Sequence, residues 1–318
     1  MNPNHPQQLD LNELSTLDRF QGCLIGLAVG DAVGTTVEFS RRGSFPLVTD
    51  MIGGGPFRLA PGQWTDDTSM ALCLATSLVT VGDFDPIDQM NRYCDWYETG
   101  YLSSTGRCFD IGNTVRQALN QYRSSGVAFS GSTHPQAAGN GCLMRLAPIP
   151  MFYFPDRQRV RHFAAESSRT THGATECLDA SWLFGDMVCQ ALAGATKTEI
   201  LFDHNLGESE TNLAPSIQAI AQGNYRHKTI DQIKGSGYVV ASLEAALWCF
   251  WQTETYEQAV LAATNLGDDA DTTAAICGSL AGAYYGVPNI PQSWREKLAM
   301  VTEITALANQ LHQFATTR

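Results

Sequence analysis

Residues 20–30 read FQGCLIGLAVG, and they carry two overlapping repeats that favour a helix. Apolar residues recur at the spacing of one helix face, at Phe20, Leu24 and Leu27. Gly22, Gly26 and Gly30 recur at every fourth position. Glycine in a helix interior costs roughly 1 kcal/mol relative to alanine. A regular glycine stripe therefore predicts close contact with a second helix.

Helical spacing also dominates the rest of the chain. Ser15-Thr16 precedes the first repeat as an expected N-cap, and Gly278 and Gly282 form a second glycine pair. Apolar residues recur at helical spacing after Thr65 and again over residues 239–250. Alternating strand patterns with hairpin signals are hard to find. We therefore predict an all-α fold.

Composition excludes several classes of protein. The chain has 318 residues, a net charge of −12, 44% hydrophobic residues and 16% charged residues. Such acidity argues against general binding of nucleic acid, although one anionic small molecule stays compatible with it. No apolar run reaches the roughly 18 residues of a membrane span. The nine cysteines form no CxxC pair, which is typical of free thiols, so we expect a cytoplasmic protein.

The domain organisation follows from polarity and from two distant acidic motifs. Residues 1–15 are polar and are expected to form a flexible N-terminal tail. We expect residues 16–318 to form a single catalytic domain, because the acidic motifs described next make chemical sense only together.

The first acidic motif is Gln63-Trp64-Thr65-Asp66-Asp67-Thr68, immediately before a helical pattern. One interpretation is a helix N-terminus, in which Thr65 caps the helix and both aspartates offset the positive end of the helix dipole. The other interpretation is a set of oxygen ligands for a metal ion.

The second acidic motif, Gly267-Asp268-Asp269-Ala270-Asp271-Thr272-Thr273, exceeds what capping requires. Its adjacent carboxylates repel one another, and a bound divalent cation would cancel that repulsion. Hard oxygen ligands suit Mg²⁺, Mn²⁺ or Ca²⁺, and no cluster has zinc spacing. Leu280 stands where the calcium-binding EF-hand loop requires a glutamate. Together the two motifs suit a pair of ions.

In this order along the chain, the motifs resemble those of the ADP-ribosylglycohydrolase family, from about Leu17 to Trp294. The resemblance is carried by Gly30-Asp31-Ala32-Val33-Gly34, Glu38-Phe39, Trp64 to Met70, Asn140-Gly141, Met144-Arg145, Thr171-His172 and Gly267 to Thr272.

This resemblance implies an orthogonal bundle of helices and a binuclear site for two Mg²⁺ or Mn²⁺ ions at the base of a cleft. The implied metal ligands are Thr65, Asp66, Asp67, Asp269, Asp271 and Thr272. Glu38 matches a glutamate above the substrate, Asn140-Gly141 a loop near the diphosphate, and His172 a histidine near the ribose. Cys108 to Gly112 resembles the nitrogenase-regulating branch, in which the aspartate, here Asp110, lies near the scissile bond. Asp268 replaces a glycine found in many members.

The implied activity is hydrolysis of the bond between the anomeric carbon of ADP-ribose and an acceptor, with ADP-ribosylarginine on a protein as the first choice. The expected partner is therefore ADP-ribose or an ADP-ribosylated protein. Such cleavage passes through an oxocarbenium-like state. Glu38 or Asp110 would handle a proton or stabilise positive charge, and the sequence leaves that choice open.

Two candidate substrate contacts have ordinary structural alternatives. His172 is either a ligand contact or a hydrogen-bonded structural histidine. Tyr238 follows Gly235-Ser236-Gly237 and either stacks on adenine or belongs to the core at the start of an apolar helix.

Two rival functions differ in class. Asp269-Ala270-Asp271-Thr272-Thr273 also spells the DxDxT motif of a phosphotransferase, which would require a buried strand before Asp269. A non-catalytic ADP-ribose-binding regulator would keep the fold without turnover. Retention of all the implied ligands, with Glu38, counts against the regulator.

Overall fold

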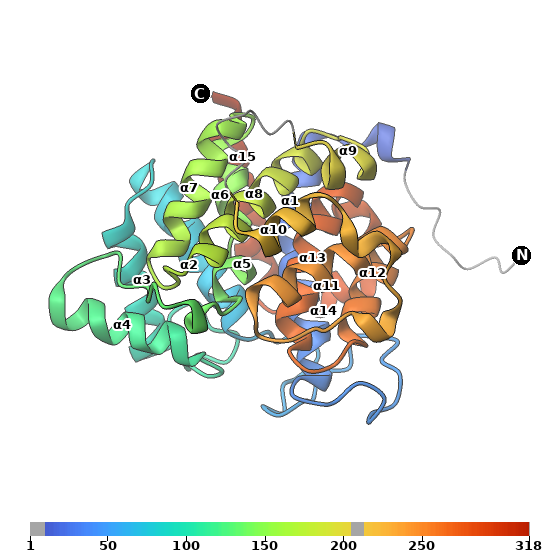
Figure 1. Ribbon diagram of the computed structural model, residues 1–318, viewed down its shortest axis with the longest axis horizontal. Coiled ribbons are helices and arrows are strands. Elements are labelled where there is room, and N and C mark those ends of the chain that lie inside the picture. The colour runs from blue at the N-terminus through green and yellow to red at the C-terminus, as the bar shows by residue number, and fades with distance from the viewer. Residues whose placement is uncertain (1–9, 205–212, 318) are drawn as a thin grey trace, which may run out of the picture.

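Helices α1 (Thr16–Gly34) and α13 (Ala270–Tyr285) form the buried centre of the computed structural model, which describes residues 10–204 and 213–317 (Figure 1). The Ser15 hydroxyl accepts a hydrogen bond from the backbone N–H of Asp18, whose carboxylate accepts from the backbone N–H of Ser15. This capping box fixes the start of α1, as the sequence predicted.

The glycine stripes of α1 and α13 lie against each other. A Cβ atom on Gly22, Gly26 or Gly30 would lie 2.2, 2.4 or 2.1 Å from a backbone carbonyl oxygen of α13. Such distances leave no room for a side chain, so the predicted close helix contact is confirmed.

The remaining α-helices surround this pair. They are α2 (Asp66–Val81), α3 (Pro86–Thr99), α4 (Asn113–Ser125), α5 (Gly141–Met144), α6 (Pro148–Tyr153), α7 (Arg157–Arg169), α8 (Thr175–Leu192), α9 (Lys197–Phe202), α10 (Pro215–Ala221), α11 (Val239–Gln252), α12 (Tyr256–Thr264), α14 (Gln292–Lys297) and α15 (Val301–Thr317). Short 3-10 helices include η1 (Leu11–Glu13) and η2 (Thr35–Val37). Within the two described ranges there is no strand, only three isolated bridges, so the all-α prediction is confirmed.

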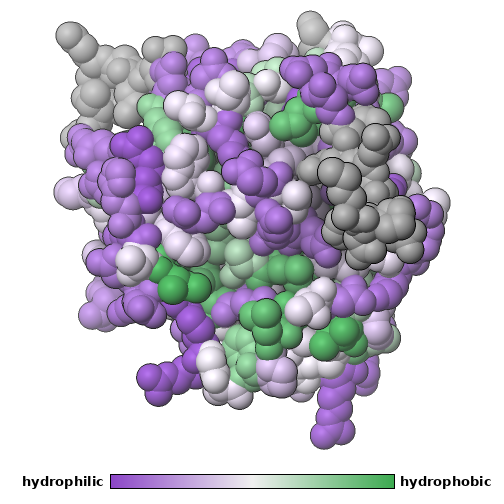
Figure 2. All heavy atoms as spheres, turned by 90° about the vertical axis from the view of Figure 1, so that its right-hand side faces the viewer, coloured by the Kyte–Doolittle hydropathy of each residue, from purple (hydrophilic) through white to green (hydrophobic). Residues whose placement is uncertain are grey.

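Two apolar clusters hold these helices together. The larger cluster surrounds α1 and α13, and the smaller one joins α2, α3 and α4 through Met70, Tyr93, Trp96 and Leu119. Figure 1 shows α3 and α4 at one end of the molecule and α11 to α13 towards the other. Most of the face in Figure 2 is hydrophilic, as the net charge of −12 leads one to expect, and its apolar side chains gather on the lower part.

The segment Thr16–Val37 is long and apolar enough, by length and composition, to cross a membrane. Gln21 and Asp31 interrupt its apolar residues, so it contains no unbroken apolar run of that length. In this fold 89% of the apolar window is buried inside the protein. The segment is therefore a core helix here.

The N-terminal tail expected over residues 1–15 lies largely outside the described residues, which begin at residue 10. Residues 11–13 form η1, whose start is capped by the Asp10 carboxylate. All nine cysteines are free thiols, as the absence of CxxC pairs suggested.

Candidate active site

The first acidic motif is held by a carboxylate from α1. Asp31 is fully buried, and its two oxygens accept hydrogen bonds from the backbone N–H groups of Thr65 (2.9 Å) and Thr68 (3.0 Å). They also accept from the hydroxyls of Thr65 (2.9 Å) and Thr68 (2.6 Å). Asp31 thus satisfies the first backbone N–H groups of α2. Thr65 is the N-cap residue of α2, with Asp66 and Asp67 in the first turn, as the capping interpretation expected, but its side chain makes no cap hydrogen bond.

Asp31 belongs to the sequence motif Gly30 to Gly34, but the motif alone does not predict that it contacts the first acidic motif. Its position in an otherwise apolar, glycine-striped helix does indicate a buried carboxylate that needs hydrogen-bond partners, because an unpaired buried charge is costly.

The second acidic motif opens α13 and meets the first one directly. The Thr272 hydroxyl donates to Asp67 Oδ1 at 3.2 Å, and the Thr65 hydroxyl shares its proton between Asp31 Oδ1 at 2.9 Å and Asp271 Oδ2 at 3.3 Å. The helix α12 precedes Asp269 where the phosphotransferase motif needs a buried strand. That rival interpretation is therefore wrong, and the two acidic motifs form one cluster.

Two oxygens of this cluster have no partner. Asp67 Oδ2 and Asp271 Oδ1 are buried and make no hydrogen bond. One oxygen from each of Asp31, Asp67 and Asp271 lies within 4.8 Å of the other two, and Glu38, Asp110 and Asp271 form a second such group. Buried polar atoms are normally satisfied, so these orphan carboxylate oxygens fit divalent cations. We call Asp31, Asp66, Asp67, Asp269 and Asp271 the acidic floor.

Burial and mutual repulsion raise the pKa values of the acidic floor. Burial, together with neighbouring carboxylates, raises the pKa of Asp67 and of Asp271 well above the usual value. Burial, followed by the charge of Asp110, raises the pKa of Glu38 to about 10. Burial, followed by the charge of Asp31, raises the pKa of Asp110 to about 7. A positive charge between these carboxylates would therefore reduce their mutual repulsion and favour their ionised forms.

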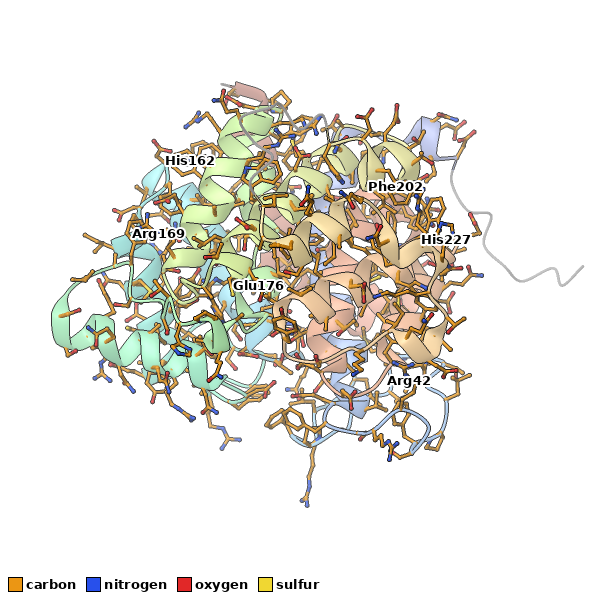
Figure 3. The ribbon with its side chains drawn as sticks, in the orientation of Figure 1. Arg42, His162, Arg169, Glu176, Phe202 and His227 are labelled. Atoms are coloured by element: carbon orange, nitrogen blue, oxygen red, sulfur yellow. The ribbon has the colours of Figure 1, made fainter. Side chains whose placement is uncertain are left out.

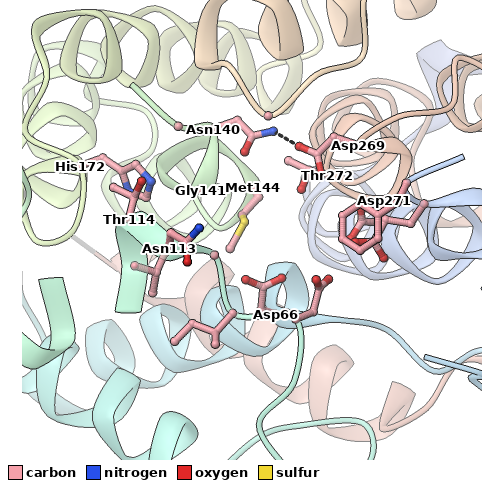
Figure 4. Close-up of a pocket in the computed structure, with 18 residues that line it drawn as sticks. Asp66, Asn113, Thr114, Asn140, Gly141, Met144, His172, Asp269, Asp271 and Thr272 are labelled. Carbon is pink, nitrogen blue, oxygen red and sulfur yellow. Dashed lines mark hydrogen bonds between the residues drawn. The ribbon is translucent and has the colours of Figure 1, made fainter. Parts of the chain in front are cut away.

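A cavity of about 340 Å³ opens above the acidic floor (Figure 4). Its lining includes most of the residues that the sequence predicted, namely Glu38, Asp66, Asp110, Asn140, Gly141, His172, Asp269, Asp271 and Thr272. Thr65 and Asp67 lie behind this lining and are fully buried. The structure thus brings together residues from six distant parts of the sequence.

Strained backbone surrounds the acidic end of the cavity. Phe39, Asp110 and Asp268 have positive φ angles of 60°, 59° and 55°. Phe39 N–H donates to the carbonyl of Asp268 at 2.7 Å, and Asp268 N–H donates to the carbonyl of Ser40 at 2.8 Å. These bonds fasten the segment after Glu38 to the second acidic motif. Left-handed backbone at non-glycine residues costs of order 1 kcal/mol or more and is concentrated at functional sites.

The same segment is tied down further along by Arg42, which is labelled in Figure 3. Its guanidinium donates to the carbonyl oxygens of Leu266, Ile230 and Ile233. Asp268 itself is exposed and does not line the cavity.

Asn140, Gly141 and His172 lie on the other side of the cavity from Asp271 (Figure 4). The Asn140 side-chain amide donates to Asp269 Oδ2 at 2.6 Å and to the Ser242 hydroxyl at 3.1 Å. His172 is buried against glycines, because a Cβ on Gly141 would lie 2.8 Å from its Cε1 atom. The cavity wall therefore depends on a residue without a side chain at position 141.

Tyr238 is the one predicted substrate-contact residue that does not line the cavity. It is 43% exposed, so it is not a core residue, and its hydroxyl donates to Glu176 at 2.7 Å. Its neighbour Gly237 does line the cavity and accepts a hydrogen bond from Asn140 N–H at 3.1 Å.

The all-helical scaffold places unpartnered, buried carboxylates that could hold a metal ion beside a cavity, an arrangement typical of one class of hydrolase. More narrowly, the chain belongs to the ADP-ribosylglycohydrolase family, whose sequence model matches residues 12–318.

Similar proteins cover nearly the whole chain. It is 44% identical to the ADP-ribosylarginine hydrolase Tri1 of Serratia proteamaculans, over 95% of this chain and 81% of that protein. It is 32% identical to the ADP-ribosyl-[dinitrogen reductase] glycohydrolase of Rhodospirillum rubrum, over 91% and 93% of the two chains. A solved structure titled ADP-ribosylglycohydrolase-related protein complex superimposes with a TM-score of 0.84 at 41% identity, covering 94% of this chain and 99% of that one.

Proposed function

We propose that this protein hydrolyses the bond between the anomeric carbon of ADP-ribose and an arginine side chain of a modified protein. The observation that carries the proposal is the acidic floor with unpartnered Asp67 and Asp271 oxygens beneath a cavity that Glu38 and Asp110 line. The arginine linkage is supported by the similarity to the hydrolase from Serratia proteamaculans, which is named for that linkage.

The acidic floor fits two Mg²⁺ or Mn²⁺ ions. Their proposed ligands are Thr65, Asp66, Asp67, Asp269, Asp271 and Thr272, and the structure adds Asp31 to the candidates. When bound, such ions would supply Lewis-acid chemistry and lower the pKa of a coordinated water.

Glu38 and Asp110 are proposed as the proton-handling pair. Their carboxyl groups are close enough for a hydrogen bond, which raises the pKa of Glu38 and lowers the pKa of Asp110 relative to the effect of burial alone. Both line the cavity, so either one can approach a leaving nitrogen or the developing positive charge of the ribose.

The remaining cavity residues are proposed to bind the substrate. Asn140 and Gly141 would face the diphosphate, and His172 would face the ribose. Tyr238 is proposed to contact the part of the ligand that projects from the cavity, since it is exposed beside Gly237.

We also propose a single catalytic domain over residues 16–318, a cytoplasmic location and an ADP-ribosylated protein as the partner. Nine free thiols support the reducing compartment. The acidic net charge of −12 supports a partner other than nucleic acid.

The decisive experiment measures release of ADP-ribose from peptides modified on arginine or on serine, with Mg²⁺ and with a chelator. We expect release from the arginine peptide only when metal is present, and loss of at least about 100-fold in rate for Asp269→Asn. Asp268→Asn is the matched control, because Asp268 is exposed, lies outside the cavity lining and has a φ angle of 55° that asparagine tolerates.

Absence of release from either peptide with metal present would overturn the proposal. Tight binding of ADP-ribose without release would instead identify a non-catalytic regulator. Release from the serine peptide alone would retain the hydrolase and correct its acceptor.

A further inference from the structure

Arg145 is a fully buried cation that has no carboxylate partner. It follows α5, and within residues 10–204 and 213–317 no carboxylate oxygen lies within 4.0 Å of its guanidinium nitrogens. Its ring neighbour is Tyr93, with the guanidinium carbon 4.8 Å from the ring centroid. A buried charge without a counter-ion is costly, so a specific task for it is expected.

The guanidinium instead donates to the segment that leads into His172. Arg145 Nη2 donates to the Ser167 carbonyl at 3.3 Å and to the hydroxyl oxygens of Thr170 at 3.1 Å and Thr171 at 2.7 Å. The Thr170 hydroxyl proton is already used, because it donates to the Ser167 carbonyl at 2.7 Å. The Thr171 hydroxyl has one remaining contact, which is His172 Nδ1 at 2.8 Å.

These contacts decide which nitrogen of His172 carries the proton. The Thr171 oxygen accepts the short hydrogen bond from Arg145, so its own proton is free to be donated. If Nδ1 were protonated, the Thr171 oxygen would accept from two donors and its proton would have no acceptor in the described part of the chain. The favourable arrangement therefore has the Thr171 hydroxyl donating to an unprotonated Nδ1, and the neutral ring then carries its proton on Nε2.

The charge state and the orientation of the ring agree with this assignment. Burial, followed by the charge of Arg145, lowers the pKa of His172 to about 3, so the ring is neutral at physiological pH. Its backbone is fixed by Ser168, whose carbonyl accepts from His172 N–H at 2.7 Å and whose hydroxyl donates to the His172 carbonyl at 2.8 Å.

The Nε2 edge of the ring faces the cavity. Nε2 lies 3.1 Å from the Cβ position of Gly141 and 3.3 Å from that of Gly139, and both glycines line the cavity with His172. Figure 4 shows His172 beside Gly141 and Thr114 at this wall. Among the residues that the structure describes, Nε2 has no hydrogen-bond partner, since the ring's recorded polar contact is made by Nδ1.

We infer that Arg145 is a positioning residue that acts through the Thr171 hydroxyl to fix His172 as the neutral tautomer protonated on Nε2. His172 is thereby a hydrogen-bond donor to an oxygen of the bound ligand, rather than a general base. The inference rests on the proposed function only for the identity of that ligand, ADP-ribose, whose ribose hydroxyls and phosphates both offer acceptor oxygens.

The test uses the full chain with ¹⁵N-labelled histidine. Imidazole nitrogens that carry a proton and those that do not resonate far apart, and His172→Gln assigns the signal among the seven histidines. We expect the Nε2–H pattern for His172 in the wild type and in Thr171→Ser. Thr171→Val, which lacks the hydroxyl, is expected to lose that pattern. Thr170→Val is the matched control, because it removes another Arg145 contact and leaves the Thr171–His172 contact in place.

Binding of ADP-ribose and of ribose 5-phosphate gives a second readout. For Thr171→Val we expect about a 10-fold rise in Kd for ADP-ribose, the size of one hydrogen bond. An equal rise for ribose 5-phosphate would identify an oxygen of the ribose half as the acceptor. A rise with ADP-ribose alone would identify an acceptor that ribose 5-phosphate lacks, the phosphate on the adenosine side.

An Nδ1–H pattern or an imidazolium in the wild type would overturn the inference. So would a Thr171→Val protein that keeps both the tautomer and the affinity of the wild type. If the wild type binds no ADP-ribose, the proposed function fails, while the ¹⁵N pattern still decides the tautomer.

Discussion

Asp186 in α8 and the acidic floor are both buried, but only Asp186 is matched with cations. Its carboxylate oxygens lie 2.6 Å from Arg157 Nη2 and 3.0 Å from Arg161 Nε, and Gln190 donates to it at 3.2 Å. Burial alone would raise the pKa of Asp186, but hydrogen bonds from Arg157, His204 and Arg161 hold it well below the usual value. This group joins α7 to α8 and needs nothing from outside the chain.

The acidic floor shows the opposite balance. Across residues 10–204 and 213–317 no lysine, arginine or histidine forms a salt bridge with Asp67 or Asp271, and burial with mutual repulsion raises both pKa values. A buried carboxylate that is paired with cations of the same chain indicates a structural role, whereas a group of buried carboxylates without such cations indicates a ligand-binding site. The contrast between the two groups is open to direct test.

Asp186→Asn should have the largest effect on folding. Removing this charge leaves the buried Arg161 and the partly buried Arg157 beside a neutral amide, and breaking such a buried pair costs about 3 to 5 kcal/mol of unfolding free energy. Urea unfolding measures the loss. Glu166→Gln, which breaks a more exposed pair with Arg169, is the control and should cost less than about 1 kcal/mol. Similar losses in the two variants would contradict the special status of Asp186.

The pH dependence of that loss has a defined sign. The pKa of Asp186 is lower in the folded protein than the roughly 3.9 of an unfolded aspartate. Its contribution is therefore complete above about pH 4 and disappears as pH falls through the folded-state pKa. The stability difference between wild type and Asp186→Asn should be constant from about pH 5 to 8 and shrink below about pH 4. A difference that grows on acidification would refute the pairing.

Asp67→Asn, unlike Asp186→Asn, should not lower the unfolding free energy of the metal-free protein. Without metal the variant should be as stable as the wild type or more stable by about 1 kcal/mol, because one repelling charge is removed. Mg²⁺ at 100 times its Kd should stabilise the wild type by about 2.7 kcal/mol, and this gain should largely vanish in the variant. Thermal unfolding with and without Mg²⁺ measures both effects. A metal-free variant that is strongly destabilised would show that Asp67 is a structural residue like Asp186.

Gly30→Ala and Gly22→Ala test whether helix contact sets the spacing of the acidic floor. Their Cβ atoms would lie 2.1 and 2.2 Å from carbonyl oxygens of α13, so each should cost about 1 to 3 kcal/mol of stability. Gly30 precedes Asp31, whereas Gly22 lies two turns away. We expect only Gly30→Ala to lower the hydrolysis rate of the folded protein as well. Equal rate losses in the two variants would show that the geometry of the acidic floor does not depend on the local spacing of α1 and α13 at Gly30.

The helical fold and most of the cavity were predictable because their signals are local. Glycine and apolar spacing indicated α1 and α13, and carboxylates in excess of capping needs indicated the acidic floor. Family order then placed Asn140 and His172 at the same cavity, where the structure has them.

Other features depend on contacts between residues that are far apart in the sequence. The partners of Asp31 lie 34 and 37 positions away, and Arg145 acts on Thr171 at a separation of 26 positions. Neither relation has a sequence spacing that identifies it. The left-handed backbone of Asp110 likewise follows from its surroundings and not from the residue type. The position of Tyr238 also involves a long-range contact, since its backbone forms a bridge with Gly139.

The hydrogen bond between Thr65 and Asp271 joins residues 206 positions apart. During synthesis the first acidic motif therefore leaves the ribosome long before the second exists, and the glycine face of α1 has no partner until α13 is made. The nascent chain must keep that apolar helix from wrong associations for most of its translation. The acidic floor is accordingly a late product of folding, and a chain truncated before residue 270 should lack it altogether.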